Sequence, residues 1–270
     1  MRKHAPSKGI FALPYAVVCA IFVVFPLLLV VVYAFRGTDG KFSLSTIAGV
    51  LSNPSNYISL LRTFGIALLS TVVCLLLAYP VAYILASSPF NKIVVLALLF
   101  VIPMWMNFML RMFALQSILS MMGIANTFAA AVIGLVYDFF PFMLLPIYTA
   151  LVNLDVSYAE AAGDLGAGAV TAFFKTTLPL SVPGIVSGIT MVFMPCFSAY
   201  AVTDVLGNAN TTLTGRKISV LFDLQEWEAG SALSLLLLVL VMITMLIGTL
   251  LQRRSHAKAA MLPKAGGRML

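Results

Sequence analysis

The chain has 270 residues, of which 61% are hydrophobic and only 9% are charged. A soluble globular domain carries about 25% charged residues and must cover its surface with polar groups. The composition therefore excludes a soluble domain and indicates an integral membrane protein whose apolar surface faces lipid. The net charge of +7 does not indicate a nucleic-acid partner, because many basic residues lie in the two tails, where they act as topology signals.

Runs without charged residues predict about six transmembrane helices, since a span needs about 20 apolar residues. They are expected at about 10–35, 63–87, 92–112, 128–152, 181–204 and 230–252. The predicted fold class is an all-α integral membrane protein, with a membrane domain over 10–252 between an N-terminal tail, 1–9, and a basic C-terminal tail, 253–270. The first run is too long for the apolar part of a signal peptide, about 7–15 residues, and is interpreted as a retained helix.

Lys and Arg set the orientation, because they are enriched in cytoplasmic loops. With both termini inside, the cytoplasmic segments hold the larger set, namely Arg2, Lys3, Lys8, Lys92, Lys175, Arg253, Arg254, Lys258, Lys264 and Arg268. The outer segments then hold Arg36, Lys41, Arg62, Arg111, Arg216 and Lys217. The sequence thus predicts that both tails and the segment 153–180 lie in the cytoplasm.

The segment 153–180, between the fourth and fifth predicted helices, has the pattern of a helical hairpin. Ser157 and Glu160 have capping-box spacing, so a helix is expected to start at Ser157. The alanines that follow give this helix a face that another helix can approach closely. Gly166 and Gly168 predict a turn, and Pro179 is expected to break the chain before the fifth helix.

Motifs for covalent chemistry are missing from the sequence. It contains no phosphate-binding loop and no H-E-x-x-H pair, and its two histidines, His4 and His256, lie in the tails. The three cysteines, all within apolar runs, lack the spacing of a metal site or a disulfide framework. We therefore expect no catalytic residue, metal site or cofactor in this chain, and any ATP to be hydrolysed by another subunit.

The hairpin resembles the E-A-A-x-x-x-G motif of importer-type ABC transporter permeases. The matching residues are Glu160, Ala161, Ala162 and Gly166, followed by Leu178 and Pro179. The resemblance implies a coupling loop that docks into an ATPase subunit, which binds the ATP and Mg. It also implies a second permease subunit, either a homologue or a second copy, an extracytoplasmic solute-binding protein, and a bacterial inner membrane.

Two further segments narrow the resemblance. The runs 103–111 and 134–146 are similar to the third- and fourth-helix signatures of spermidine/putrescine-type permeases. This similarity implies a permease for a polyamine, although related importers carry other small solutes, and that alternative stays open.

Asp138 is the carboxylate that lies well inside a predicted helix. It is about ten residues from Phe128, which places it about 15 Å deep, where a charge costs about 2.5–3.5 kcal/mol. It therefore needs a water-filled cavity, a protein cation or a cationic solute. Tyr137, Phe139 and Phe140 flank it, and aromatic faces attract ammonium groups. Two interpretations remain open: a solute path, or an ion pair within the bundle, for instance with Arg111.

Further candidates for the path are Tyr200 and Asp204, near the outer end of the fifth helix, and Trp105, although a tryptophan at such a position is more often an interfacial anchor than a ligand. No Lys or Arg is expected at the depth of Asp138, which argues against an anionic solute. Two other functions compete. A secondary transporter would use Asp138 as an ion site and show two repeated halves, which we do not find. A channel or an assembly scaffold is the third possibility.

Overall fold

The computed structural model describes residues 9–36, 41–87, 99–155, 157–208 and 211–260. Within these ranges the named elements are all helical, and extended backbone pairs only in an isolated bridge between Arg36 and Phe42. The elements are α1 (Gly9–Cys19), η1 (Ala20–Val24), α2 (Phe25–Ala34), α3 (Ser45–Ser52), α4 (Pro54–Ser87), η3 (Ile102–Trp105), α6 (Phe108–Met121), α7 (Phe128–Val152), α8 (Ser157–Asp164), α9 (Ala169–Ala172), η4 (Phe173–Thr177), α10 (Leu178–Cys196), α11 (Tyr200–Leu206), α12 (Thr214–Asp223) and α13 (Trp227–Ala260). The predicted all-α class is confirmed.

The chain forms two compact units. The first comprises Met1–Ile58 and Lys217–Val239, and the second comprises Ser59–Arg216 and Leu240–Leu270. The first unit has a small apolar core in which α2, α3, α12 and α13 meet. Its buried residues are Ala34, Val50, Ala232 and Leu233. By contrast, none of the most apolar stretch within Pro14–Ala34 is buried, as expected for a helix whose side chains are solvated by lipid.

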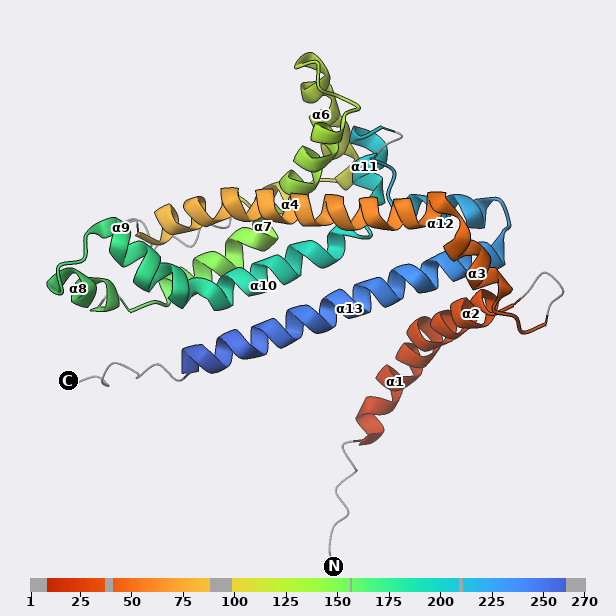
Figure 1. Cartoon of the computed structure of the whole chain (residues 1–270), viewed down its shortest axis with the longest axis horizontal. Coiled ribbons are helices and arrows are strands. Elements are labelled where there is room, and N and C mark those ends of the chain that lie inside the picture. The colour runs from red at the N-terminus through yellow and green to blue at the C-terminus, as the bar shows by residue number, and fades with distance from the viewer. Residues whose placement is uncertain (1–8, 37–40, 88–98, 156, 209–210, 261–270) are drawn as a thin grey trace, which may run out of the picture. The chain divides into compact units, whose positions relative to one another are not determined.

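Helix α7 is the centre of the second unit. Of its most apolar stretch 56% is buried, against 28% or less in the other candidate spans. It lies alongside α10, as Figure 1 shows, and also packs against α11 and α6. Because α7 is covered by protein on most sides, polar side chains on it are kept away from lipid.

Small residues allow α7 to pack closely against its neighbours. A Cβ added at Gly184 of α10 would collide with Ala150 and lie 2.8 Å from the Pro146 carbonyl oxygen. At Gly188 it would lie 2.8 Å from the sulfur of Met143. Glycines spaced four residues apart thus form one face of α10, and this face lets the two helix backbones approach.

The described residues contain five helices long and apolar enough to cross a membrane: Pro14–Ala34, Pro54–Ser87, Phe128–Val152, Ala169–Cys196 and Trp227–Leu250. The third of the six predicted helices, at 92–112, is not among them. Its part over 88–98 lies outside the described residues. The remainder contains the short 3₁₀ turn η3 and then α6, which points away from the direction of α10 (Figure 1).

The break between η3 and α6 has a local cause. Pro103 has no N–H to donate to a helix and occupies the first turn of η3. Asn107 is extended at φ −55° and ψ 130°, and its side chain accepts a hydrogen bond from the Leu110 N–H at 3.2 Å. Asn107 is therefore the N-cap that starts a new helix, α6, rather than an interior position of one long helix.

The fifth helix also differs from its predicted bounds, 181–204. It begins at Ala169 and runs through the π-turn η4 into α10, so the expected break at Pro179 is wrong. In η4 the N–H of Leu178 bonds to the carbonyl of Phe173, and this widened turn accommodates a proline that cannot donate. The helix ends at Cys196, and α11 follows separately over Tyr200–Leu206.

The other bounds differ less. The sequence places a helix at 128–152, where α7 spans Phe128–Val152. The second helix, expected at 63–87, begins earlier, at Pro54, and the last, expected at 230–252, extends over Trp227–Ala260. Polar residues at the ends of an apolar run continue a helix into the interface and the water, which a count of apolar residues does not detect.

Candidate functional site

The hairpin between α7 and α10 is built from standard helix ends. At the start of α8, the N–H of Ser157 donates to Asp155 Oδ1 at 3.0 Å, and this bond lowers the pKa of the Asp155 carboxyl from its ordinary value. The side chain of Asp155, two residues before Ser157, thus accepts a hydrogen bond from the first N–H of the helix. The helix does start at Ser157, as the sequence predicts.

The end of α8 is a Schellman motif. Gly166 has a φ of +84°, its N–H bonds to the Gly163 carbonyl at 2.8 Å, and the Ala167 N–H bonds to the Ala162 carbonyl at 3.0 Å. The turn expected at Gly166 is therefore present. Glycine is favoured here because a side chain strains the backbone at positive φ.

Most of the predicted coupling residues lie on the outer surface of this hairpin. Glu160, Ala161, Gly166 and Pro179 are exposed, while Ala162 and Leu178 are half-buried. Two large apolar side chains on the hairpin are exposed as well, Leu165 at 89% and Val170 at 71%. These exposed apolar side chains are free to contact another protein.

The base of the hairpin is held by the C-terminal half of α4. The ring of Phe173 packs edge-on against Tyr79 and Tyr83, with centroid distances of 5.9 and 5.2 Å. The hydroxyls of Tyr79 and buried Ser181 are 3.0 Å apart. The sequence did not predict this connection. A π-turn begins at Phe173, and such turns often mark functional positions, but no sequence pattern indicated it.

Asp138, on α7, forms an ion pair with Arg111 of α6. The pair is largely buried, with the two side chains 13% and 8% exposed. Arg111 also donates from Nη1 to the Pro103 carbonyl at 3.2 Å. The ion pair with Arg111, one of the two interpretations that the sequence left open, is present. The expectation that no Lys or Arg lies at the depth of Asp138 is wrong, since the change of direction at Asn107 brings Arg111 to it.

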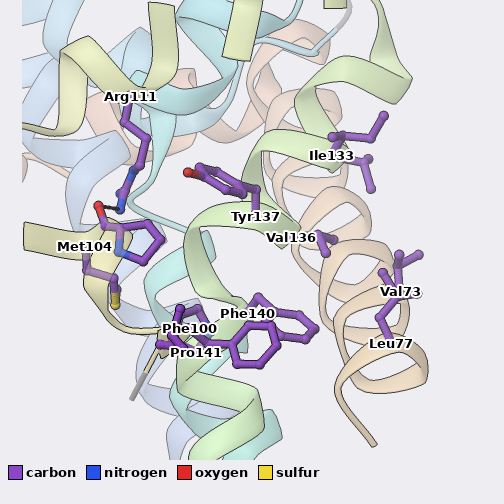
Figure 2. A pocket seen from close by; sticks show the side chains of 13 residues that line it. Val73, Leu77, Phe100, Met104, Arg111, Ile133, Val136, Tyr137, Phe140 and Pro141 are labelled. Carbon is purple, nitrogen blue, oxygen red and sulfur yellow. Dashed lines mark hydrogen bonds between the residues drawn. The ribbon is translucent and has the colours of Figure 1, made fainter. Parts of the chain in front are cut away.

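A cavity of about 440 Å³ has Arg111 of this pair in its wall. Figure 2 shows side chains that line it. Arg111, Tyr137 and Phe140 are among its walls. The other lining residues are mainly apolar: Val73, Leu77, Leu99, Phe100, Pro103, Met104, Val132, Ile133, Val136 and Pro141. An interrupted helix is tolerated in a membrane domain where the break is covered by protein or lines a cavity, and here the η3 turn contributes Pro103 and Met104 to the cavity wall.

The structure does not bring all predicted path residues together. Phe139 is buried in the core beside Phe142, and Trp105 is 88% exposed. Tyr200 and Asp204 lie on α11, where Asp204 pairs with Arg216 at 3.4 Å. Tyr137 and Phe140 therefore line the cavity, whereas these other candidates lie elsewhere in the second unit.

Comparison with known proteins identifies the family of the chain. Residues 76–257 match the family described as the binding-protein-dependent transport system inner membrane component. The chain belongs to this family. It is therefore a multi-pass inner-membrane protein, a non-catalytic permease component of an ABC importer, and the resemblance first seen at Glu160–Gly166 is confirmed. The matched range contains the hairpin and, except for Val73, all the residues that line the cavity.

Curated relatives share about a third of their residues with the chain. The spermidine/putrescine transport system permease protein PotB of Escherichia coli (strain K12) is 34% identical over 215 residues, covering 73% of this chain and 78% of the relative. The proteins of the same name from Salmonella typhi and Haemophilus influenzae are each 33% identical, covering 84% and 82% of this chain and 87% and 85% of the relatives.

A solved structure has a similar fold. It is a chain of a bacterial ABC transporter involved in the import of the acidic polysaccharide alginate, with a TM-score of 0.69 and 18% identity. The match covers 92% of this chain and 98% of the other. At this identity it supports the fold, an ABC importer permease, and nothing about the solute.

Proposed function

We propose that this chain is a permease subunit of an importer for polyamines such as spermidine and putrescine. The observation that carries the proposal is the carboxylate of Asp138 on the most buried span, paired with Arg111 in the wall of a cavity lined by aromatic and apolar side chains. The names of the similar permeases agree with it. A polyamine consists of ammonium groups joined by methylenes, so a carboxylate and aromatic faces suit one part and apolar walls the other.

The path we propose includes Asp138, Tyr137 and Phe140 at the cavity. Candidates of second rank are Phe139, Trp105, Tyr200 and Asp204, of which the last two would act nearer the outer end. A solute must be held weakly enough to leave, and one carboxylate already shared with an arginine meets that condition better than an acidic cluster.

In the proposed mechanism the hairpin docks into the ATPase subunit. Glu160, Ala161, Ala162 and Gly166 form the docking helix and its turn, and the exposed Leu165 would be covered by the partner. Leu178 and Pro179 begin α10 and thereby join the hairpin directly to a membrane span. The contact of Phe173 with α4 supplies a second route by which movement of the hairpin reaches the membrane.

The proposed assembly contains ABC ATPase subunits that bind ATP and Mg, a second permease subunit, most simply a homologue, and an extracytoplasmic solute-binding protein. The membrane domain is proposed to span 10–252 with six transmembrane helices. The coupling loop, 153–180, and the tails, 1–9 and 253–270, would lie in the cytoplasm.

Uptake by the complete complex in proteoliposomes tests the solute. Labelled putrescine and spermidine should accumulate only when ATP is present, at constant membrane potential. A labelled sugar and a labelled carboxylate anion serve as comparison solutes. Transport of either comparison solute without any polyamine transport would contradict the solute assignment, and uptake independent of ATP would contradict the mechanism.

A second candidate solute class follows from the ion pair. Because Arg111 neutralises Asp138, the site as a whole carries no net charge, which also suits a small neutral solute. The sugar arm of the same experiment decides between the two classes.

A further inference from the structure

Four groups surround the guanidinium of Arg111 in a way that would suit any organic cation. Asp138 supplies a carboxylate and Pro103 a backbone carbonyl oxygen at 3.2 Å. The rings of Tyr137 and Phe108 lie 5.7 and 6.0 Å from the guanidinium carbon. A carboxylate, a carbonyl and two aromatic rings are the elements of an ammonium-binding site, since each offers negative charge or a negative face to a cation.

One of the N–H donors of the guanidinium has no hydrogen-bond acceptor in this site among the described residues. Nε of Arg111 is buried and has no acceptor among the described residues, although the side chain is only 8% exposed. A buried donor without an acceptor weakens the hold of the site on its occupant. The adjoining cavity of about 440 Å³, with Arg111 itself in the wall, provides space beside the pair.

We propose that the guanidinium of Arg111 occupies a binding site for ammonium groups, and that an ammonium group of the solute displaces it from Asp138 during transport. This inference rests on the proposed polyamine function. Asp138 can neutralise one cation at a time, so binding of the solute is an exchange of cations rather than the addition of one.

Exchange has two consequences for an importer. The carboxylate keeps a cation throughout, and the displaced guanidinium must be solvated in the adjoining cavity until it returns, because an unpaired charge in the membrane costs several kcal/mol. The return of Arg111 to Asp138 also expels the solute, so the site binds an ammonium group without retaining it. A neutral solute cannot exchange with a guanidinium, so the arginine acts as a specificity-determining residue.

The test is direct binding of labelled putrescine to the complete complex in lipid nanodiscs, without the solute-binding protein. The variant Arg111→Met removes the resident cation and keeps an unbranched side chain. It should bind putrescine about tenfold more tightly or better, because loss of one competing ion pair worth about 1.4 kcal/mol changes the affinity by this factor. Asp138→Asn and the double variant Arg111→Met/Asp138→Asn should both bind at least tenfold more weakly than Arg111→Met.

Control variants separate this effect from a structural one. Arg62→Met, at an exposed arginine on α4, should bind putrescine as the parent does. Arg111→Gln keeps a donor for the Pro103 carbonyl without the charge, and it repeats the test if the Met variant does not assemble. A structural role for the pair would lower assembly in Asp138→Asn and restore it in the double variant, but would not tighten binding in Arg111→Met.

Equal binding of putrescine by the parent and by Arg111→Met and Arg111→Gln would contradict the proposed exchange. Tight binding by the double variant would contradict it as well. These results differ from failure of the proposed function. That failure appears in the parent complex, supplied with its solute-binding protein and ATP, as the absence of polyamine uptake.

Discussion

At the scale of single residues, Gly166 shows how a backbone angle fixes the shape of the hairpin. Its φ of +84° lets the N–H groups of Gly166 and Ala167 turn back onto the last carbonyls of α8. No neighbouring atom lies within 4 Å of an added Cβ, so a substitution would meet backbone strain rather than a collision. The strain for a non-glycine residue at such an angle is about 1 kcal/mol or more.

Gly166→Ala is therefore expected to loosen the turn and to reduce the number of solute molecules transported per ATP by several-fold, while the subunit still inserts. Gly168→Ala is the matched control, because Gly168 has a φ of −64° and no atom within 4 Å of an added Cβ. Uptake and ATP hydrolysis are measured together in proteoliposomes. A Gly166→Ala complex with the parent ratio would show that coupling does not depend on this turn.

At the scale of helices, charge-free runs located most of the membrane segments because a charge in lipid is costly. The range 128–152 and the helix α7 agree for this reason. The same rule does not detect a break within an apolar run. Pro103 and Asn107 carry that information, through a missing N–H and a side-chain cap, but proline also occurs in continuous spans, as Pro179 does in α10.

The packing of α7 against α10 gives a prediction about stability. Gly184→Ala should force these helices apart, because the new methyl group meets Ala150 and the Pro146 carbonyl, neither of which can rotate away. Overpacking of this kind costs about 1–3 kcal/mol. The thermal midpoint of the purified complex should fall by several degrees.

Gly65→Ala on α4 is the control for that measurement. It makes the same substitution within a helix, but no atom lies within 4 Å of the new Cβ. Alanine also has the higher helix propensity, so the midpoint should stay the same or rise. Equal decreases in both variants would mean that Gly184 has no special packing role.

At the scale of the whole molecule, the sequence identified a residue of the candidate site but did not predict which residues lie next to it. Asp138 was identified because a buried carboxylate is expensive wherever it lies. Its partner is 27 positions away on another helix, and only the change of direction at Asn107 brings the two together. Trp105, a candidate for the solute path that lies close to Arg111 in the sequence, is 88% exposed. Short spacing along a chain does not predict contact across an irregular segment.

Two of the candidate membrane spans have few buried residues in their most apolar stretch. The helix over Pro14–Ala34 has none of its most apolar stretch buried, and the corresponding stretch of Trp227–Leu250 has only 6%. Lipid and the proposed second permease subunit are the two environments that can cover such helices in an importer. Neither environment determines the orientation of the chain, for which the distribution of Lys and Arg is the available evidence.

Accessibility to a membrane-impermeant thiol reagent tests that orientation. In a background with Cys19, Cys74 and Cys196 replaced by Ala, reagent added outside intact cells should label Lys41→Cys and Gln225→Cys. The same reagent should label Ser87→Cys and Gly168→Cys only after the membrane is opened. All four positions are exposed in the structure, so burial within the chain does not explain a difference between them. The reverse pattern would place the hairpin outside the cell, where no ATPase could reach it, and would contradict the proposed coupling together with the topology.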